Sequence, residues 1–221
     1  MKRTVLVTEG DSPLGAALVR ILRAKGWAVA AAVGSGPETP EEAPGPQFLA
    51  VRWNRRSPVS AHTLLLSALN AFGGLDEAFV LEAPVPPPVP LHKAASVDIE
   101  KAFDDAKGAV YAARELLSHF LERKSGVLCL VSGLREAPAG GLDASLHEAF
   151  RGLASSLLAP QPDAGLVVNG FQSVGASPEE FAGFIDRTLD EKARKITGRW
   201  FTCPPKGGFF QGVLSGPSRK G

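Results

Sequence analysis

Asp143 and His147 stand four residues apart in a segment whose apolar spacing predicts a helix over residues 143–159. Side chains at this spacing share one face of a helix, so the carboxylate can accept a hydrogen bond from the imidazole. Two interpretations remain open: an ordinary surface pair, which we favour, and an acid–base pair with a catalytic task. An aspartic acid is a poor proton donor at pH 7, because its usual pKa lies about three units below neutrality.

A glycine-containing loop near the N-terminus is a second candidate site. The sequence Thr8-Glu9-Gly10-Asp11-Ser12-Pro13-Leu14-Gly15 follows a short apolar run and precedes a helical pattern. Such a loop can bring a pyrophosphate against the N–H groups of a helix N-terminus. Glu9 and Asp11 would repel phosphates, by roughly 2–3 kcal/mol per like-charge pair about 6 Å apart at an effective dielectric of about 20. The interpretation that we favour is that Asp11 or Ser12 caps the helix and Pro13 starts it.

Alternating strand and helix patterns must position these residues. They predict an α/β fold, a doubly wound parallel sheet of about seven strands with helices on both faces. We expect a single domain over residues 1–208, followed by a mobile tail over 209–221 unless Phe209 and Phe210 anchor it. The expected strands are 4–8, 27–33, 47–51, 77–82, 126–132, 164–169 and 198–203, and the expected helices are 13–25, 59–72, 97–123, 143–159 and 178–193.

Two proline-rich segments interrupt this alternation. Residues 36–46 contain four prolines where a crossover helix would otherwise lie, so we expect a rigid loop there. Residues 84–90 contain five prolines directly after a predicted strand, and we expect an extended polyproline conformation. A stiff loop is the favoured role of this second segment, and docking of a proline-reading domain is the alternative.

Composition excludes several classes of partner. Lys and Arg number 24 against 23 Asp and Glu, so the chain offers no general attraction for nucleic acid or anionic lipid. No segment reaches the roughly 18 apolar residues that would cross a bilayer, and the histidines have no metal-ligand spacing. Cys129 and Cys203 lie far apart in apolar runs, so we expect buried thiols, a cytoplasmic protein and no metal.

Taken in order, these segments resemble the short-chain dehydrogenase/reductase family over about nine tenths of the chain, and the resemblance implies a Rossmann-like fold. The loop Thr8–Gly15 replaces the family's Thr-Gly-x-x-x-Gly-x-Gly, and Leu81-Glu82-Ala83-Pro84 replaces its Asn-Asn-Ala-Gly. Gly126–Ser132 matches the strand that delivers the catalytic serine, and Asp105–Gly108 matches an Asn-x-x-Gly. Arg151-Gly152-Leu153 matches the end of the motif that begins with Tyr-x-x-x-Lys.

The catalytic pair that the resemblance implies is missing. Tyr111 is the chain's single tyrosine, and Glu115 rather than a lysine follows it four residues later. Counting back from Arg151 places Asp143 at the family's tyrosine and His147 at its lysine. In the family the tyrosine gives a proton to the substrate carbonyl while the lysine lowers the tyrosine's pKa and holds the ribose. The positions equivalent to the family's catalytic residues are Asp105, Ser132, Asp143 and His147.

Cofactor selection is also weak. If a dinucleotide bound, the resemblance implies contacts from Thr8, Gly10, Ser12, Leu14, Gly15 and Asn54. The end of the second strand reads Val33-Gly34-Ser35, which has neither an acid for the 2′-hydroxyl of NAD nor an arginine for the 2′-phosphate of NADP. Asn54 could bond the adenine, although a surface asparagine is the favoured interpretation.

We therefore predict a catalytically degenerate relative that acts as a binding, scaffolding or regulatory module and has no conventional cofactor. The resemblance also implies a homodimer, or a related hetero-oligomer, through the helices near 97–123 and 143–159. The alternative is a divergent NAD(P)-dependent oxidoreductase that uses Ser132 with Asp143 or His147. A third hypothesis joins Asp105, Ser132 and His147 as a hydrolytic triad, against which no nucleophile-elbow glycines surround Ser132.

Overall fold

The computed structural model describes residues 2–34, 47–83, 88–134, 140–159 and 165–204. The predicted segments at 36–46 and 209–221 lie outside these residues, as do positions 84–87 of the proline run at 84–90. The strands are β1 (Thr4–Val7), β2 (Ala28–Val33), β3 (Phe48–Arg52), β4 (Glu77–Leu81), β5 (Gly126–Leu134), β6 (Leu166–Ser173) and β7 (Arg199–Cys203). The helices are α1 (Pro13–Ala24), α2 (Pro58–Phe72), the short 3₁₀ turn η1 (Leu91–Lys93), α3 (Ser96–Arg123), α4 (Gly141–Leu157), α5 (Pro178–Thr188) and the π-helical turn η2 (Leu189–Ala193).

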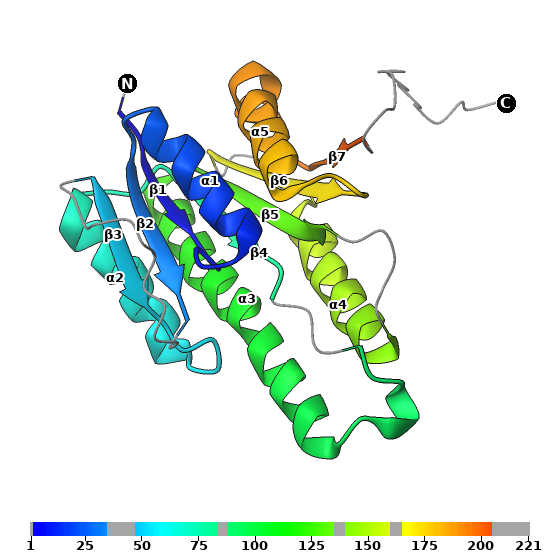
Figure 1. Ribbon diagram of the computed structural model, residues 1–221. Helices are drawn as coiled ribbons and strands as arrows, with labels where there is room; N and C mark the ends of the chain where they lie inside the picture. Colours follow the sequence, from blue (N-terminus) through cyan, green and yellow to red (C-terminus); the bar gives the residue numbers. More distant parts are fainter. Residues whose placement is uncertain (1, 35–46, 84–87, 135–139, 160–164, 205–221) are drawn as a thin grey trace, which may run out of the picture.

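The seven strands form one parallel sheet in the order β3-β2-β1-β4-β5-β6-β7. Helices α1 and α5 cover one face, and α2, α3 and α4 cover the other (Figure 1). The predicted doubly wound α/β fold is therefore confirmed. The chain reverses its winding between β1 and β4, and ligands of such sheets bind at the carboxyl ends of the strands next to this reversal.

Strand composition explains why the sheet is buried on both faces. β2 (Ala-Val-Ala-Ala-Ala-Val) is buried at every position, as is β4. Without a polar face these segments are stable only between two helical layers. One apolar core lies against α1 and α5 and contains Phe171 and Phe181, and the other lies against α2, α3 and α4 and contains Leu64 and Phe120.

Element boundaries differ from the prediction mainly in the C-terminal half. β6 continues to Ser173 rather than ending at 169, since Phe171 is fully buried against the sheet's core. The predicted helix 178–193 ends as an α-helix at Thr188 and continues as the π-helical turn η2. A capping box starts α5, with Ser177 and Glu180 each bonding the other's backbone N–H.

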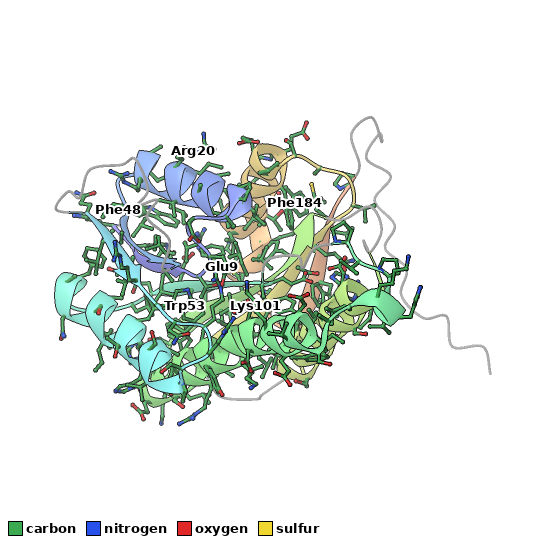
Figure 2. The ribbon with its side chains drawn as sticks, turned by 60° about the horizontal axis from the view of Figure 1, so that its bottom comes forward. Glu9, Arg20, Phe48, Trp53, Lys101 and Phe184 are labelled. Atoms are coloured by element: carbon green, nitrogen blue, oxygen red, sulfur yellow. The ribbon has the colours of Figure 1, made fainter. Side chains whose placement is uncertain are left out.

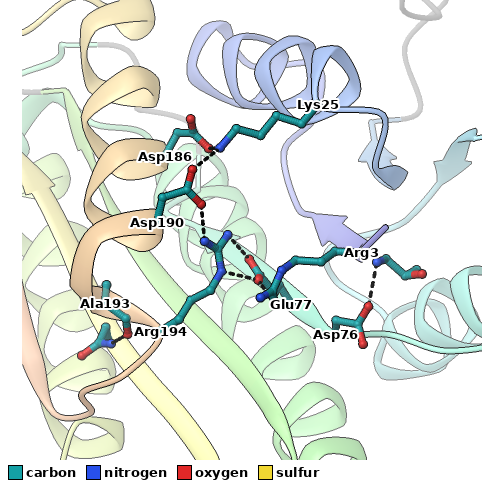
Figure 3. Close-up of polar contacts among 10 residues, drawn as sticks. Arg3, Lys25, Asp76, Glu77, Asp186, Asp190, Ala193 and Arg194 are labelled. Atoms are coloured by element: carbon teal, nitrogen blue, oxygen red, sulfur yellow. Dashed lines mark hydrogen bonds and ion pairs between the residues drawn. The ribbon is translucent and has the colours of Figure 1, made fainter. Parts of the chain in front are cut away.

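An ion cluster closes the amino end of the sheet, and it contains three cations and three anions (Figure 3). Glu77 begins β4 with no exposed surface, and its carboxylate contacts Arg3 Nη1 at 2.7 Å and Arg194 Nε at 2.6 Å. Asp190 joins Arg194 to Lys25, whose ammonium also contacts Asp186. We call these six residues the amino-end ion cluster: Arg3, Lys25, Glu77, Asp186, Asp190 and Arg194.

Candidate functional site

The loop after β1 lies at the winding reversal and is tied firmly to neighbouring strands. Thr8 N donates to Phe79 O at 2.9 Å, and Thr8 Oγ1 accepts from Leu81 N at 2.8 Å. Gly10 N donates to Ala32 O at 2.7 Å. The hydroxyl and amide of Thr8 thus hold the ends of β1 and β4 together, which fixes the floor of the candidate nucleotide site.

Glu9 is the unexpected residue of this loop. It is 3% exposed, and its backbone φ of 53° lies in the left-handed region that favours glycine. Its carboxylate forms a two-bonded pair with Arg55, in which Nε donates to Oε1 at 2.7 Å and Nη2 donates to Oε2. Burial raises the pKa of the Glu9 carboxyl, because desolvation outweighs the hydrogen bond and charge of Arg55.

Arg55 is held from several sides. Its guanidinium lies 5.9 Å from the ring centroid of Trp53, within reach of a cation–π contact. Gly108 of α3 packs so closely that a Cβ atom there would come within 2.8 Å of Arg55 Cβ. Figure 2 shows Glu9 and Trp53 inside the fold, between the two helical layers. The predicted repulsion of phosphates by Glu9 therefore needs correction, because Arg55 neutralises this carboxylate. The two side chains still occupy space in the loop region.

The helix-capping interpretation is confirmed for Ser12. Its side chain accepts from Gly15 N at 3.0 Å, and Pro13 is the first residue of α1. Asp11 instead accepts from Gly34 N at 2.7 Å, at the end of β2. Gly15 has no room for a side chain, since a Cβ atom would lie 2.0 Å from Glu9 O.

Two residues predicted to contact a dinucleotide also have structural roles in the fold. Leu14 is buried in the core beneath α1. Asn54 is exposed, and its Oδ1 accepts from Arg56 N at 3.0 Å, which makes a local turn after β3. The surface interpretation of Asn54 agrees with this geometry.

A second cluster lies at the same edge of the sheet, around Glu82. This residue follows β4, and its Oε2 accepts from Gly133 N at 2.7 Å and from Ser132 Oγ at 3.2 Å. His147 Nδ1 of α4 lies 3.0 Å from Oε1 of the same carboxylate. The Glu82 side chain is 5% exposed and that of His147 is 19% exposed, so the pair is largely shielded from water. We call Glu82, Ser132 and His147 the Glu82 cluster.

The predicted surface pair of Asp143 and His147 is wrong. Asp143 is 2% exposed, and the imidazole of His147 contacts Glu82. The reason is that the end of β4 places the Glu82 carboxylate beside the His147 ring. Spacing along the sequence does not indicate this contact.

The hypothetical triad is not assembled either. Asp105 Oδ1 pairs with Arg56 Nε at 3.2 Å. Ser132 Oγ donates to Glu82 rather than to His147. Tyr111 lies within α3, and Glu115 of the same helix accepts from His62 Nδ1 at 2.8 Å.

A hollow of about 200 Å³ opens between α3 and α4 and ends at Glu82. Its walls are almost entirely apolar, and Phe103 and Val110 on its side of α3 are 47% and 48% exposed. The other principal wall residues are Ala106, Leu146, Phe150 and Leu153.

Within the described ranges, no group of three or more His, Cys, Asp or Glu side chains could hold a metal ion. The helices of these ranges include none that is long and apolar enough to span a bilayer. Cys129 and Cys203 are free and buried, and burial raises the pKa of both thiols.

Comparison of the whole chain with known proteins gives fold neighbours only. No family model and no curated protein matches the sequence. The structure is similar to 3-ketoacyl-(acyl-carrier-protein) reductase from Brucella melitensis complexed with NADH, with a TM-score of 0.82 and 15% identity over 92% of this chain and 97% of that one. A variant of a Serratia marcescens short-chain dehydrogenase/reductase matches with a TM-score of 0.74 and 20% identity over 91% and 96%. Acetoin dehydrogenase from Enterobacter cloacae matches with a TM-score of 0.76 and 18% identity, over 92% of this chain and 94% of that one.

The chain has the short-chain dehydrogenase/reductase fold. Within this fold, sequence reasoning located Ser132 and His147 at one edge but missed Glu82 as their common partner. It also missed Arg55 as the partner of Glu9. The available signal was the replacement of a family glycine by Glu9 and of a family asparagine by Glu82, since a buried acid requires a partner.

Proposed function

We propose that this protein is a short-chain dehydrogenase/reductase fold that does not bind NAD(P) in the usual way and acts as a binding, scaffolding or regulatory module. The observation that carries the proposal is the pair of Glu9 with Arg55. It occupies the loop after β1, where a dinucleotide of such a sheet would place its phosphates. Binding a dinucleotide there would require displacing a buried, hydrogen-bonded ion pair.

The Glu82 cluster supports the same conclusion. A substrate carbonyl beside Ser132 would need the hydroxyl as a hydrogen-bond donor. That hydroxyl already donates to Glu82, and Gly133 N and His147 hold the same carboxylate in place. The acid that this fold's hydride-transfer chemistry requires, a tyrosine, is absent from the position of Asp143.

The module's partner is a second copy of this chain or a related chain, docked over α3 and α4. Phe103 and Val110 expose about half of their surface on α3 beside the hollow, and a two-fold related copy would cover both. Phe103→Asp should convert a dimer to a monomer in analytical ultracentrifugation. Val59→Asp, at another exposed apolar position, is the matched control. A wild-type monomer at about 100 μM would contradict this assembly.

We also propose a cytoplasmic location, since both thiols are free.

Thermal shift with NADH and NADPH tests the central proposal. Wild-type protein should show no stabilisation at about 1 mM of either nucleotide, because a ligand at a hundred times its Kd would add about 2.7 kcal/mol. Glu9→Gly, in which the carboxylate is removed and the backbone conformation is retained, should gain a measurable response. A micromolar response of the wild type would overturn the proposal.

One observation favours a second function, a divergent NAD(P)-dependent oxidoreductase that uses Ser132 with Asp143 or His147. Ser132 and His147 converge on one carboxylate at the winding edge, and the Brucella neighbour is complexed with NADH. The same titration separates the two functions, since the oxidoreductase requires wild-type binding of a nucleotide.

A further inference from the structure

A second hollow lies at the amino edge of the sheet, opposite the edge that carries Glu9 and Glu82. It has a volume of about 280 Å³, close to the roughly 300 Å³ at which small-molecule pockets begin. We call it the amino-edge pocket, and the residues that line it are Arg20, Arg23, Trp27 and Gln47.

Parallel strand pairing brings together the residues that precede three strands. Trp27 precedes β2 and Gln47 precedes β3, and Val29 N donates to Gln47 O at 2.8 Å. Lys2 lies before β1, which pairs with the other side of β2. With its amide oriented so that both atoms are bonded, Gln47 donates to Gly26 O and accepts from Lys2 Nζ, each at 2.9 Å. The Lys2 ammonium is thus held beside the pocket.

Trp27 brings an indole N–H to the pocket wall. The residue is only 8% exposed, and the cations of Arg3, Lys25 and Arg194 lie 5.8, 5.3 and 5.1 Å from its ring centroid. Within the part of the chain that the structure describes, no acceptor bonds this indole N–H. Because a largely buried indole normally has a hydrogen-bond partner, the donor favours a ligand with acceptor oxygens.

Two arginines of α1 complete the wall. The guanidinium of Arg23 lies 4.5 Å from the Phe48 ring centroid and has a further contact of its own, so we assign the ligand to Arg20. Arg20 Nη2 donates to Glu179 at 3.0 Å, and Nε donates to Ala16 O at 3.4 Å. The Arg20 and Glu179 side chains are 57% and 64% exposed, so water and salt weaken this pair. An anion in the pocket can therefore compete for the guanidinium, whose fork of N–H groups suits oxyanions.

We propose that the amino-edge pocket binds a small phosphate monoester. A guanidinium from Arg20, an indole N–H from Trp27 and an ammonium from Lys2 surround one space. The three terminal oxygens of a phosphate accept hydrogen bonds from several directions, whereas a carboxylate has two oxygens in one plane. The remaining volume admits a small organic group. This site goes beyond the proposed module and lies at the opposite edge of the sheet from the loop after β1.

Titration of the full chain with phenyl phosphate, followed by ¹H–¹⁵N NMR of the indole groups, tests the site. The chain has three tryptophans, and Trp27→Phe assigns the signal of interest. The Trp27 signal should shift with a Kd below about 1 mM, while the signals of Trp53 and Trp200 stay in place. No shift at about 10 mM, or equal shifts of all three signals, would overturn the proposal.

Arg20→Gln tests the guanidinium. It should raise the Kd of phenyl phosphate about fivefold or more, because a charge-assisted hydrogen bond is lost. Arg114→Gln is the matched control and should leave the Kd unchanged, since Arg114 is a 70% exposed arginine that lies 3.7 Å from Glu115 on α3. Equal Kd values in the two variants would contradict the assignment.

Glu179→Gln tests the competition for Arg20. Removing this carboxylate should lower the Kd of phenyl phosphate about twofold to threefold, because the anion no longer competes with an ion pair. A purely structural role of the pair between Arg20 and Glu179 would not tighten binding. An unchanged or higher Kd would therefore refute the role of Arg20.

Benzoate tests the chemical class of the ligand. It has the same ring as phenyl phosphate with a planar carboxylate, and its Kd should be about tenfold higher or more. Equal Kd values would assign the pocket to carboxylates and end the phosphate proposal. A dinucleotide bound at the loop after β1 lies at the other edge of the sheet and should leave the Trp27 signal unchanged, so this proposal and the proposed module fail independently.

Discussion

Strand β4 begins at Glu77 and is directly followed by Glu82, and the two carboxylates have different partners. Glu77 at the amino end is fully buried and contacts two arginines, within a cluster whose charges balance (Figure 3). Glu82 at the carboxyl end is shielded and contacts a hydroxyl, a backbone N–H and an imidazole. Two arginines contact the carboxylate of Glu77, whereas the contacts of Glu82 include a hydroxyl, a backbone N–H and an imidazole.

The two ends of this strand also differ in position, because one joins α1 and α5 to the sheet and the other lies in the candidate site. Arginine stays charged at every physiological pH, and the ion cluster around Glu77 joins β4 to α1 and α5. The opposite end contacts the imidazole of His147 and lies in the candidate site. Substitutions at the two ends should therefore differ in which property they change.

Glu77→Ala should have the largest effect on stability. Removing the carboxylate leaves Arg194, whose side chain is 12% exposed, without its main partner, and breaking a buried pair costs about 3–5 kcal/mol. Urea unfolding at pH 7 measures this loss. Glu82→Ala should cost less, about 1–3 kcal/mol, because the Ser132 hydroxyl and the Gly133 N–H lose this acceptor. Equal losses of unfolding free energy in Glu77→Ala and Glu82→Ala would contradict the comparison.

Breaking the pair of Glu9 with Arg55 should lower the free energy of unfolding by an amount between these two losses. Arg55→Ala should lower the free energy of unfolding by about 2–3 kcal/mol, since it leaves a 4% exposed carboxylate uncompensated. In the double variant Glu9→Ala/Arg55→Ala the total loss should be smaller than the sum of the single losses by about 1–3 kcal/mol. Additive losses in a denaturant series would show that the two side chains do not stabilise one another.

Sequence patterns predicted the fold well because local and long-range preferences agree. The apolar runs that became β2 and β4 have no polar face, so only a sheet covered on both sides can bury them. The caps at Ser12 and Ser177 lie where the residue order predicted helix starts. The predicted module, dimer and absence of a cofactor stay predictions.

The candidate site was predicted less completely, because its contacts join elements that are distant in the sequence. Glu82 and His147 are 65 residues apart, and Glu9 and Arg55 are 46 apart. Spacing on one helix suggested Asp143 for His147, yet the sheet's register brought Glu82 to the ring instead. Pairing of this kind follows from strand order, which no local pattern discloses.

The smallest expected effect concerns pH and Asp190. The hydrogen bond from Lys25 lowers the pKa of Asp190, so the folded state binds this proton more weakly than the unfolded chain does. The stabilisation is complete above about pH 4, near the unfolded pKa, and is lost as the pH falls through the lower folded pKa. Because the Asp190 side chain is 52% exposed, we expect it to contribute under about 1 kcal/mol to the free energy of unfolding.

Urea unfolding of wild type and Asp190→Asn at pH 7, 5, 4 and 3 measures this contribution. The stability difference between the two proteins should be constant from pH 7 to 5 and should shrink below about pH 4. A difference that grows on acidification would contradict the assigned direction.

The left-handed backbone at Glu9, with φ of 53°, determines which substitutions this position accepts most easily. A side chain at this conformation costs about 1 kcal/mol or more, whereas glycine adopts it freely. Any glutamate codon becomes a glycine codon through one base change, and the loop would need no rearrangement to accept the smaller residue. Replacement of Glu9 by glycine is therefore a single mutational step, which laboratory selection for nucleotide binding can test.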